Sequence, residues 1–262
     1  MRPKVCNLLN SQLGHSIKDS FYVQEEKEEY VEALQVEAFG EIILWLVRWY
    51  CRYALSYRDL KEIAAERGLS VERSTIMRWV HEYSPELEKR IKPHLKMSCS
   101  STRIDETYVK IKGIWHYLYR AVDKDGQTLD WMLSVKRNKK AAKKFFRKML
   151  GNPHVPTPTV MNVDKNPAFP PAHQELIEEG ELPSTSKLRR VKYLNNIVEN
   201  DHKSVKCKSR YRQWYQSFAT ASATISGMET MRMIQKGQIK YLAKNDIVSQ
   251  NKLINRLFGL VA

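Results

Sequence analysis

Three acidic residues, Asp105, Asp164 and Glu199, have the type and placement that metal-dependent phosphoryl transfer requires. That chemistry needs a nucleophilic oxygen, a leaving oxygen and neutralisation of the phosphate charge. Two hard cations about 3.5–4 Å apart can supply all of this. Such cations prefer carboxylate oxygens, and Mg²⁺ keeps several of its waters, so three carboxylates are enough to hold them. A strand presents a carboxylate rigidly, and a helix can bring another from the opposite side.

Each of these acids also has a purely structural interpretation. Asp105 can be a polar residue of an edge strand, because its neighbour Glu106 shows that acids are tolerated there. Asp164 can simply begin a turn. Glu199 follows Asn196 by three residues, and this spacing also fits a helix-capping box. The residue types alone leave both interpretations open.

The elements around the first two acids predict a mixed sheet. Asp105 lies in the first of three consecutive strand-like runs with short connections, which favour an antiparallel meander. A helix and a short buried strand that ends at Asp164 follow them. The runs are Thr102–Val109, Trp115–Val122 and Thr128–Val135, then a helix at Lys139–Leu150 and a strand at Thr159–Val163. With a helix over 170–179, a strand over 188–191 and a helix over 196–206, this α+β order is typical of a ribonuclease-H-like core.

The charge balance points to a polyanionic partner. The 262 residues include 44 Lys+Arg and 29 Asp+Glu, for a formal net charge of +15. Nucleic acid is the commonest partner of such a basic chain. A ribosome- or membrane-associated protein without chemistry remains open on charge alone. The basic face of the helix at 139–150 either contacts phosphates or is only solvated.

The residues before the predicted sheet fit a helix-turn-helix DNA-binding domain. After a helix at Phe39–Tyr53, Ser56 begins a capping box, Gly68 ends the second helix, and Ser70 is expected to cap the third. Pro85 and Pro93 mark the exit of the third helix. The exposed start of this helix presents side chains that reach phosphates or base edges in a major groove, namely Arg73, Ser74, Thr75 and Arg78. A plain helical hairpin with solvated arginines is the alternative.

We therefore predict an N-terminal helix-turn-helix domain followed by an α+β core of the ribonuclease-H-like type. The expected boundaries are 1–38 for a variable N-terminal segment, 39–97 for the DNA-binding domain, 98–238 for the catalytic domain and 239–262 for a C-terminal tail. Residues 96–101 are expected to form the linker between the two domains. The four cysteines lie far apart, which disfavours a zinc ribbon and fits a reducing cytoplasm.

Several longer sequence words stand in the order found in one known family. The words are Tyr57-Arg58-Asp59-Leu60, Arg78-Trp79-Val80, Asp105-Glu106-Thr107-Tyr108-Val109-Lys110, Tyr117-Leu118-Tyr119-Arg120-Ala121-Val122-Asp123, Asn162-Val163-Asp164-Lys165-Asn166 and Tyr193-Leu194-Asn195-Asn196-Ile197-Val198-Glu199. The chain resembles bacterial insertion-sequence transposases of the DDE type, specifically the insertion-sequence-six family, from about Phe39 to Gln238. The 34 residues between Asp164 and Glu199 match the spacing of that family's last two catalytic acids.

The resemblance implies a function for each matching position. Asp105, Asp164 and Glu199 would bind Mg²⁺, with Mn²⁺ as a substitute, and the helix from Arg73 to Arg78 would bind the inverted repeats of the element. Lys206 would lie near the DNA. The implied protein is a cytoplasmic, nucleoid-associated homo-oligomer, at least a dimer on double-stranded DNA. It would cleave and transfer strands in cointegrate-type transposition.

Two departures from the family pattern bear on activity. Trp214 stands where the family has glycine, and Ser222-Ala223 stands where paired arginines are common. One alternative function is therefore a sequence-specific DNA-binding protein derived from a transposase, without catalytic activity. A nuclease without strand transfer is the other.

Overall fold

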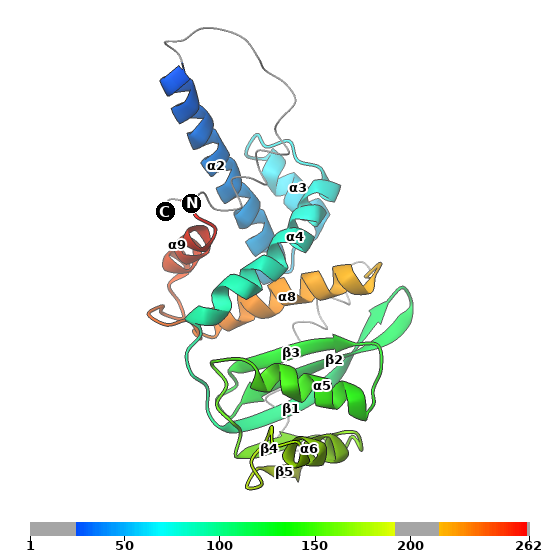
Figure 1. Ribbon diagram of the computed structural model, residues 1–262. Helices are drawn as coiled ribbons and strands as arrows, with labels where there is room; N and C mark the ends of the chain where they lie inside the picture. The colour runs from blue at the N-terminus through cyan, green and yellow to red at the C-terminus, as the bar shows by residue number, and fades with distance from the viewer. Residues whose placement is uncertain (1–24, 192–214, 261–262) are drawn as a thin grey trace.

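The computed structural model describes residues 25–191 and 215–260, with side chains described from residue 39 onward. A group of helices occupies one end of the molecule and a five-stranded sheet the other (Figure 1). Helix α8 (Phe218–Gln235) lies between the two parts and packs against both. None of the helices in these ranges is long and apolar enough to cross a membrane.

The helical part contains α2 (Glu25–Arg52), α3 (Tyr57–Ala65), α4 (Arg73–Ile91) and α9 (Ile247–Leu257). Its core includes Ile43, Leu60, Ile76 and Phe258, all at most 2% exposed. Helix α2 thus begins well before the predicted helix start at residue 39. Helix α9 forms within the stretch expected to be a tail, because its apolar face closes this same core.

Local signals set the start of α3 as predicted. Ser56 Oγ accepts a hydrogen bond from Asp59 N at 3.1 Å, and Asp59 Oδ2 accepts one from Ser56 N at 2.6 Å, which confirms the capping box. Gly68 then takes a φ of +75°, a conformation that favours glycine and ends the helix. The prediction that Ser70 caps the next helix is wrong. Glu72 is the N-cap residue and makes no side-chain cap bond, and its carboxylate pairs with Lys61 of α3 instead.

Helix α4 continues through Pro85, so the prediction that this proline marks the helix exit is wrong. A proline in a helix interior costs one backbone hydrogen bond and some strain. Burial of Leu87 and Ile91 beyond the proline offsets that cost, because both pack into the helical core. A short 3₁₀ turn, Lys92–His94, then contains Pro93 and ends the element.

The sheet has the strand order β3-β2-β1-β4-β5. Strands β1 (Ser101–Ile111), β2 (Ile114–Asp123) and β3 (Thr128–Ser134) form the predicted antiparallel meander. Strands β4 (Val160–Val163) and β5 (Lys187–Arg190) extend it in parallel to β1. Lys112 and Gly113 both have positive φ angles, 47° and 82°, as a tight two-residue hairpin turn requires. The mixed α+β class is confirmed.

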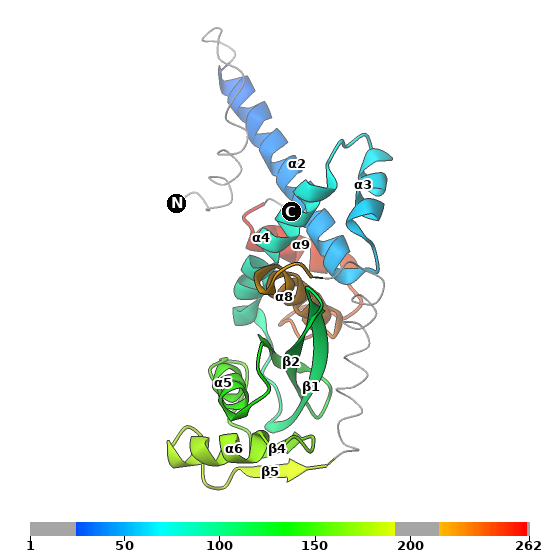
Figure 2. The same ribbon diagram turned by 90° about the vertical axis from the view of Figure 1, so that its right-hand side faces the viewer.

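Helices cover both faces of the sheet (Figures 1 and 2). On one face, α5 (Lys139–Leu150) and α6 (Phe169–Glu178) bury an aromatic core around Phe145, Phe146 and Phe169. On the other face, Ala221, Ile225 and Met228 of α8 pack against the meander.

Candidate active site

Asp105 and Asp164 come from adjacent parallel strands. β1 pairs with β4 up to Ile104 and Val163, and each aspartate is the next residue along its chain. Ile104 and Val163 both contribute to the core beneath α5 and α6. Because side chains alternate across a strand, Asp105 projects to the opposite face, on which α8 packs. Asp164 leaves the end of β4 beside it, about one strand spacing of 4.8 Å away. Both residues are half-buried.

Asp164 also begins a turn, as the alternative structural role considered for this residue predicts. Its Oδ1 accepts a hydrogen bond from Asn166 N at 3.0 Å, and Asn166 Oδ1 accepts one from Ala168 N at 2.9 Å. Within the described ranges, the other oxygen of Asp164 has no hydrogen-bond partner. Turn formation therefore fixes the carboxylate and still leaves one of its oxygens for a ligand.

Glu106 ties β1 to the turn that follows β4. Its side chain is only 3% exposed and forms an ion pair with Arg137, and its Oε2 accepts a hydrogen bond from Asn166 Nδ2 at 2.9 Å. Burial raises the pKa of Glu106; Arg137 opposes this shift, and the nearby charge of Asp164 adds to it. Glu106 is therefore more than an acid that an edge strand tolerates. Asn166 is hydrogen-bonded to both Glu106 and Asp164. It therefore connects the end of β4, which Asp164 follows, to the part of β1 that carries Asp105.

The cross-strand neighbour of Asp105 is Arg120, on β2. Arg120 is fully buried, and its Nη2 lies 2.8 Å from Oε2 of Glu229, an equally buried residue of α8. A hydrogen-bonded ion pair in such surroundings holds its geometry tightly, because losing one partner leaves the other charge buried without compensation. The pair thus fixes α8 against the strand beside Asp105.

The predicted DNA-binding residues lie at the start of α4. Arg73, Ser74 and Arg78 are exposed, Thr75 is half-buried, and Arg78 Nη2 lies 3.4 Å from Thr75 Oγ1. The opposite side of this turn is the buried face of the helix, which includes Ile76. All four side chains therefore share the surface of one helix start.

Two predicted site residues, Glu199 and Lys206, lie outside the described residues, as does Trp214. Ser222 and Ala223, the other departure from the family pattern, lie on α8. They line a shallow cavity of about 330 Å³ together with Trp131 and Phe218.

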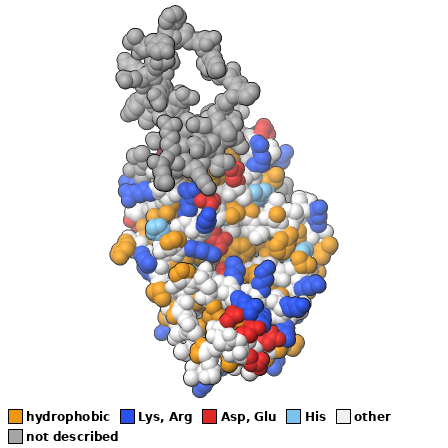
Figure 3. Space-filling view, viewed as in Figure 1, with side chains coloured by type: hydrophobic (Ala, Val, Ile, Leu, Met, Phe, Trp, Pro, Cys, Tyr) orange, Lys and Arg blue, Asp and Glu red, His pale blue; other side chains and the backbone are white. Residues whose placement is uncertain are grey.

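Much of the basic face of α5 forms ion pairs within the protein. Lys143 Nζ lies 2.8 Å from Glu175 and 2.7 Å from Glu179, and Arg147 pairs with Glu179 and Glu181. Figure 3 shows the acidic side chains gathered beside Lys and Arg in this region. These contacts disfavour phosphate binding as the main purpose of the face, and the sequence pattern of α5 alone did not reveal the acidic partners on and after α6.

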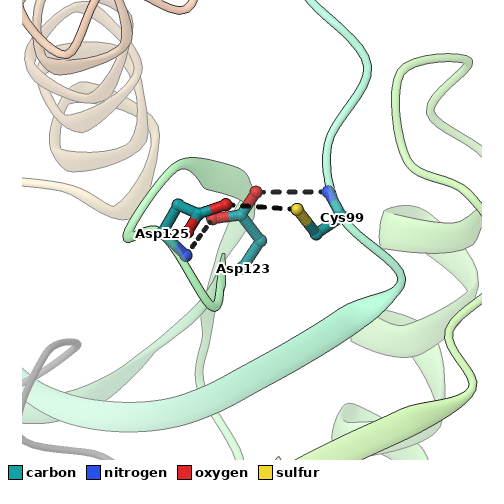
Figure 4. A group of neighbouring side chains, drawn as sticks. All are labelled: Cys99, Asp123 and Asp125. Carbon is teal, nitrogen blue, oxygen red and sulfur yellow. Dashed lines mark hydrogen bonds between the residues drawn. The ribbon is translucent and has the colours of Figure 1, made fainter.

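A second group with metal-ligand chemistry is Cys99, Asp123 and Asp125 (Figure 4). Its geometry is that of a stabilised turn. Asp123 Oδ1 accepts hydrogen bonds from the backbone N–H groups of Asp125 and Gln127 at 3.0 and 2.8 Å, and its Oδ2 accepts one from Cys99 N at 3.2 Å. The Cys99 thiol donates to Asp125 at 3.2 Å, and this bond raises the pKa of the thiol. These hydrogen bonds account for the positions of all three side chains, so we assign these residues to the turn.

Comparison with known protein families gives independent evidence on the class of this protein. Residues 99–238 match a family model described as a DDE domain. Fold and sequence together therefore define a DDE-domain protein.

Curated relatives narrow this class. The chain is 39% identical over 196 residues to the "Transposase for insertion sequence-like element IS431mec" of Staphylococcus aureus (strain Mu50), covering 75% of this chain and 85% of the relative. It is equally similar over the same shares to the "Transposase for insertion sequence element IS257 in transposon Tn4003" of Staphylococcus aureus. The chain belongs to the DDE transposase family, whose enzymes are polynucleotidyl transferases.

Solved structures also resemble the chain. One is the HTLV-2 integrase catalytic core domain in complex with magnesium, with 18% identity, a TM-score of 0.36, and coverage of 51% of this chain and 85% of that one. Another is the simian T-cell lymphotropic virus intasome in complex with the B56 gamma regulatory subunit of PP2A, with 15% identity, a TM-score of 0.35, and coverage of 64% and 67%.

Proposed function

We propose that this transposase binds the inverted repeats of an insertion sequence of the insertion-sequence-six family and carries out metal-dependent strand cleavage and strand transfer. The observation that supports this best is the pairing of β1 with β4, which brings Asp105 and Asp164 out at neighbouring positions. With Glu199, these residues would form the acidic triad.

The donor set fits a hard divalent cation. Two half-buried carboxylates on adjacent strands supply oxygen ligands, and a cation that keeps several waters needs few more. We propose Mg²⁺, with Mn²⁺ as a substitute, held by Asp105, Asp164 and Glu199. When bound, the metal would activate the nucleophilic oxygen and stabilise the leaving oxygen.

The side chains of the protein provide positioning. The hydrogen bonds of Asn166 hold the turn that carries Asp164 and connect it to Glu106, one residue beyond Asp105. The Arg120–Glu229 pair fixes the strand next to Asp105. Preset ligand oxygens of this kind need little rearrangement when the phosphate arrives, and this lowers the barrier to reaction.

We propose that residues 39–97 form a helix-turn-helix domain that grips the DNA end through Arg73, Ser74, Thr75 and Arg78, with Lys206 near the DNA. Residues 98–238 would form the catalytic domain, as at least a dimer on double-stranded DNA. The exposed positions of Arg73 and Arg78 support this division. Arg78→Ala should weaken binding to element ends, and binding should fall steeply with salt because phosphate contacts release counterions.

The decisive experiment measures strand transfer with a pre-cut DNA end that carries the inverted repeat flanking the gene. Asp105→Asn, Asp164→Asn and Glu199→Gln should each abolish joined product in Mg²⁺, while the melting temperature and end binding stay near wild type. Combined substitutions should lower activity no further, since the three acids act as one unit.

The alternatives predict different outcomes of the same experiment. Full activity in Glu199→Gln would assign Glu199 to helix capping, because glutamine also serves at that position. Cleaved but never joined DNA would identify a nuclease. Binding without cleavage in the wild-type chain would identify a catalytically inactive DNA-binding protein.

A further inference from the structure

The hairpin of β1 and β2 carries three aromatic rings on one face, of which Tyr108 and Trp115 are exposed and Tyr117 is half-buried. Tyr108 and Tyr117 are cross-strand partners with ring centroids 5.4 Å apart, and Tyr108 meets Trp115 edge-on at 6.0 Å. Tyr108 is 52% exposed and Trp115 is 55% exposed. Exposed aromatic rings that contact one another are unusual on a protein surface without a partner. We call Tyr108, Trp115 and Tyr117 the aromatic cluster.

Basic side chains surround the aromatic cluster. Lys110 Nζ lies 5.4 Å from the centroid of the Trp115 ring, and Arg137 Nη1, whose guanidinium also pairs with Glu106, lies 3.4 Å from the hydroxyl of Tyr108. Lys112, at the hairpin turn, and Lys136, next to Arg137 in the chain, are exposed. Residues 107–122 contain no acidic residue. Figure 3 shows hydrophobic side chains at the edge of the molecule where this hairpin projects, with Lys and Arg beside them.

This combination of rings and cations suits nucleic acid that is not fully paired. In a duplex, each base is stacked between its neighbours, so an aromatic side chain can stack only on a base that has left the helix. Stacking tolerates any base, because every base has a flat π face, and a surrounding positive surface follows the phosphates. A hydrophobic partner protein would match the rings but would gain nothing from the cations.

The position of the hairpin relates the cluster to the proposed site. Tyr108 is three residues beyond Asp105 on the same strand, a path of about 10 Å at 3.4 Å per residue. Its side chain lies on the opposite face of the sheet from Asp105. A nucleotide bound there would therefore lie about three residues along the strand from the proposed metal site, on the other face of the sheet, and would not block that site.

We propose that the aromatic cluster binds an unpaired nucleotide at the DNA end, with Trp115 or Tyr108 stacked on its base and Lys110 on its phosphate. The Lys110 ammonium group lies over the Trp115 ring at the end of a flexible side chain. An arriving base can therefore displace it toward the phosphates of the DNA backbone. The inference rests on the proposed function for its partner, DNA. It deepens that function because it predicts that the protein prefers DNA ends with unpaired bases.

The test compares two fluorescent duplexes that differ only in a six-nucleotide overhang, one of thymidines and one of abasic residues. The abasic overhang keeps every phosphate and removes every base. Affinity is measured by anisotropy without divalent metal, so neither cleavage nor the triad contributes. Wild-type protein should prefer the thymidine overhang by about fivefold or more, the range expected for one stacked base.

Trp115→Ala combined with Tyr108→Ala should abolish that preference while leaving affinity for the abasic duplex unchanged. Trp115→Phe should retain most of it. Tyr241→Ala is the matched control, because Tyr241 is a fully exposed aromatic residue far from the hairpin in sequence. Asp105→Asn should keep the preference, so failure of the triad proposal would leave this result intact.

Other results would overturn the inference. No preference in the wild-type protein, or a preference that survives the double substitution, would mean that the cluster does not bind bases. Equal loss of affinity for both duplexes would indicate phosphate contact alone. A change in oligomeric state by light scattering, with DNA binding unchanged, would assign the cluster to contact with a second copy. Should the double variant fail to fold, quenching of Trp115 fluorescence by the thymidine overhang, measured as wild type minus Trp115→Phe, gives the same decision.

Discussion

Asn166→Ala is the substitution that tests how the two aspartates are positioned. Asn166 is 5% exposed and makes one bond to the Glu106 carboxylate and one to the backbone N of Ala168, both 2.9 Å. Hydrogen bonds to charged groups contribute about 1.5–3 kcal/mol and neutral ones about 0.5–1.5 kcal/mol. The free energy of unfolding should therefore fall by roughly 2–4 kcal/mol, since one bond is buried and the other partly buried.

The same substitution should change metal dependence. Asn166 N still donates to Asp164, but the turn loses its connection to β1. Residues that orient metal ligands typically affect metal affinity or activity by about 10- to 100-fold when lost. We expect the Mg²⁺ concentration for half-maximal strand transfer to rise about tenfold or more, with much of the rate recovered at saturating Mg²⁺.

The assay is a Mg²⁺ titration of strand transfer at a temperature where the variant remains folded. Asn138→Ala is the matched control: Asn138 caps α5 through one side-chain bond to Ala141 N, so its loss should cost about 1 kcal/mol of stability and leave the titration unchanged. A destabilised Asn166→Ala variant with wild-type Mg²⁺ dependence would refute the positioning argument and reduce Asn166 to a structural residue.

Three further predictions concern the packing around the site. Arg120→Met or Glu229→Met alone should lower the free energy of unfolding, measured by urea titration, by about 3–5 kcal/mol. The double variant should recover most of that lost free energy. A double variant as unstable as either single one would contradict the pairing. Gly227→Ala should cost about 1–3 kcal/mol, because a Cβ there would lie 2.4 Å from Ser84 Oγ and 2.5 Å from Cys51 Sγ. Adding Ser84→Gly should recover only part of the melting temperature, since the Cys51 clash remains, and full recovery would contradict this packing. Two lysines of α5 lower the pKa of Glu175 to about 2. The stabilising contribution of Glu175 is therefore present above its unfolded pKa near 4.3 and is lost as the pH falls toward 2. Glu175→Gln should flatten the fall in melting temperature over that pH range, and an unchanged pH profile would contradict this.

Local signals predicted those parts of the fold that depend on a few neighbouring residues. The capping box at Ser56 and Asp59, the meander and the apolar face of α5 follow from spacing alone, since each involves contacts within one element or one hairpin. The adjacency of Asp105 and Asp164 follows from the order of strands, as soon as β4 is placed beside β1.

Features that depend on distant partners were not predictable in this way. The helix continues through Pro85 because residues of α4 beyond it are buried against α8 and α9, which lie far away in sequence. Glu106 looked like a tolerated surface acid until Asn166 and Arg137 were placed against it. The sequence left open whether the basic face of α5 contacts phosphates or is only solvated, because its acidic partners lie on and after α6.

Helix α8 joins the proposed DNA-binding helix to the proposed catalytic strands. Met231 and Ile234 enter the helical core, whereas Ile225 and Met228 enter the core beneath the sheet, and Glu229 pairs with Arg120. The segment 96–101, expected to be a linker, is itself held by backbone bonds from Lys96 to Gln238 and from Ser98 to His154. The start of α4 and the strand of Asp105 are thus connected through packed elements and not through a loose hinge. We expect a tilt of α4 on DNA to be transmitted to β2 through α8, so that end binding and alignment of the acids occur together.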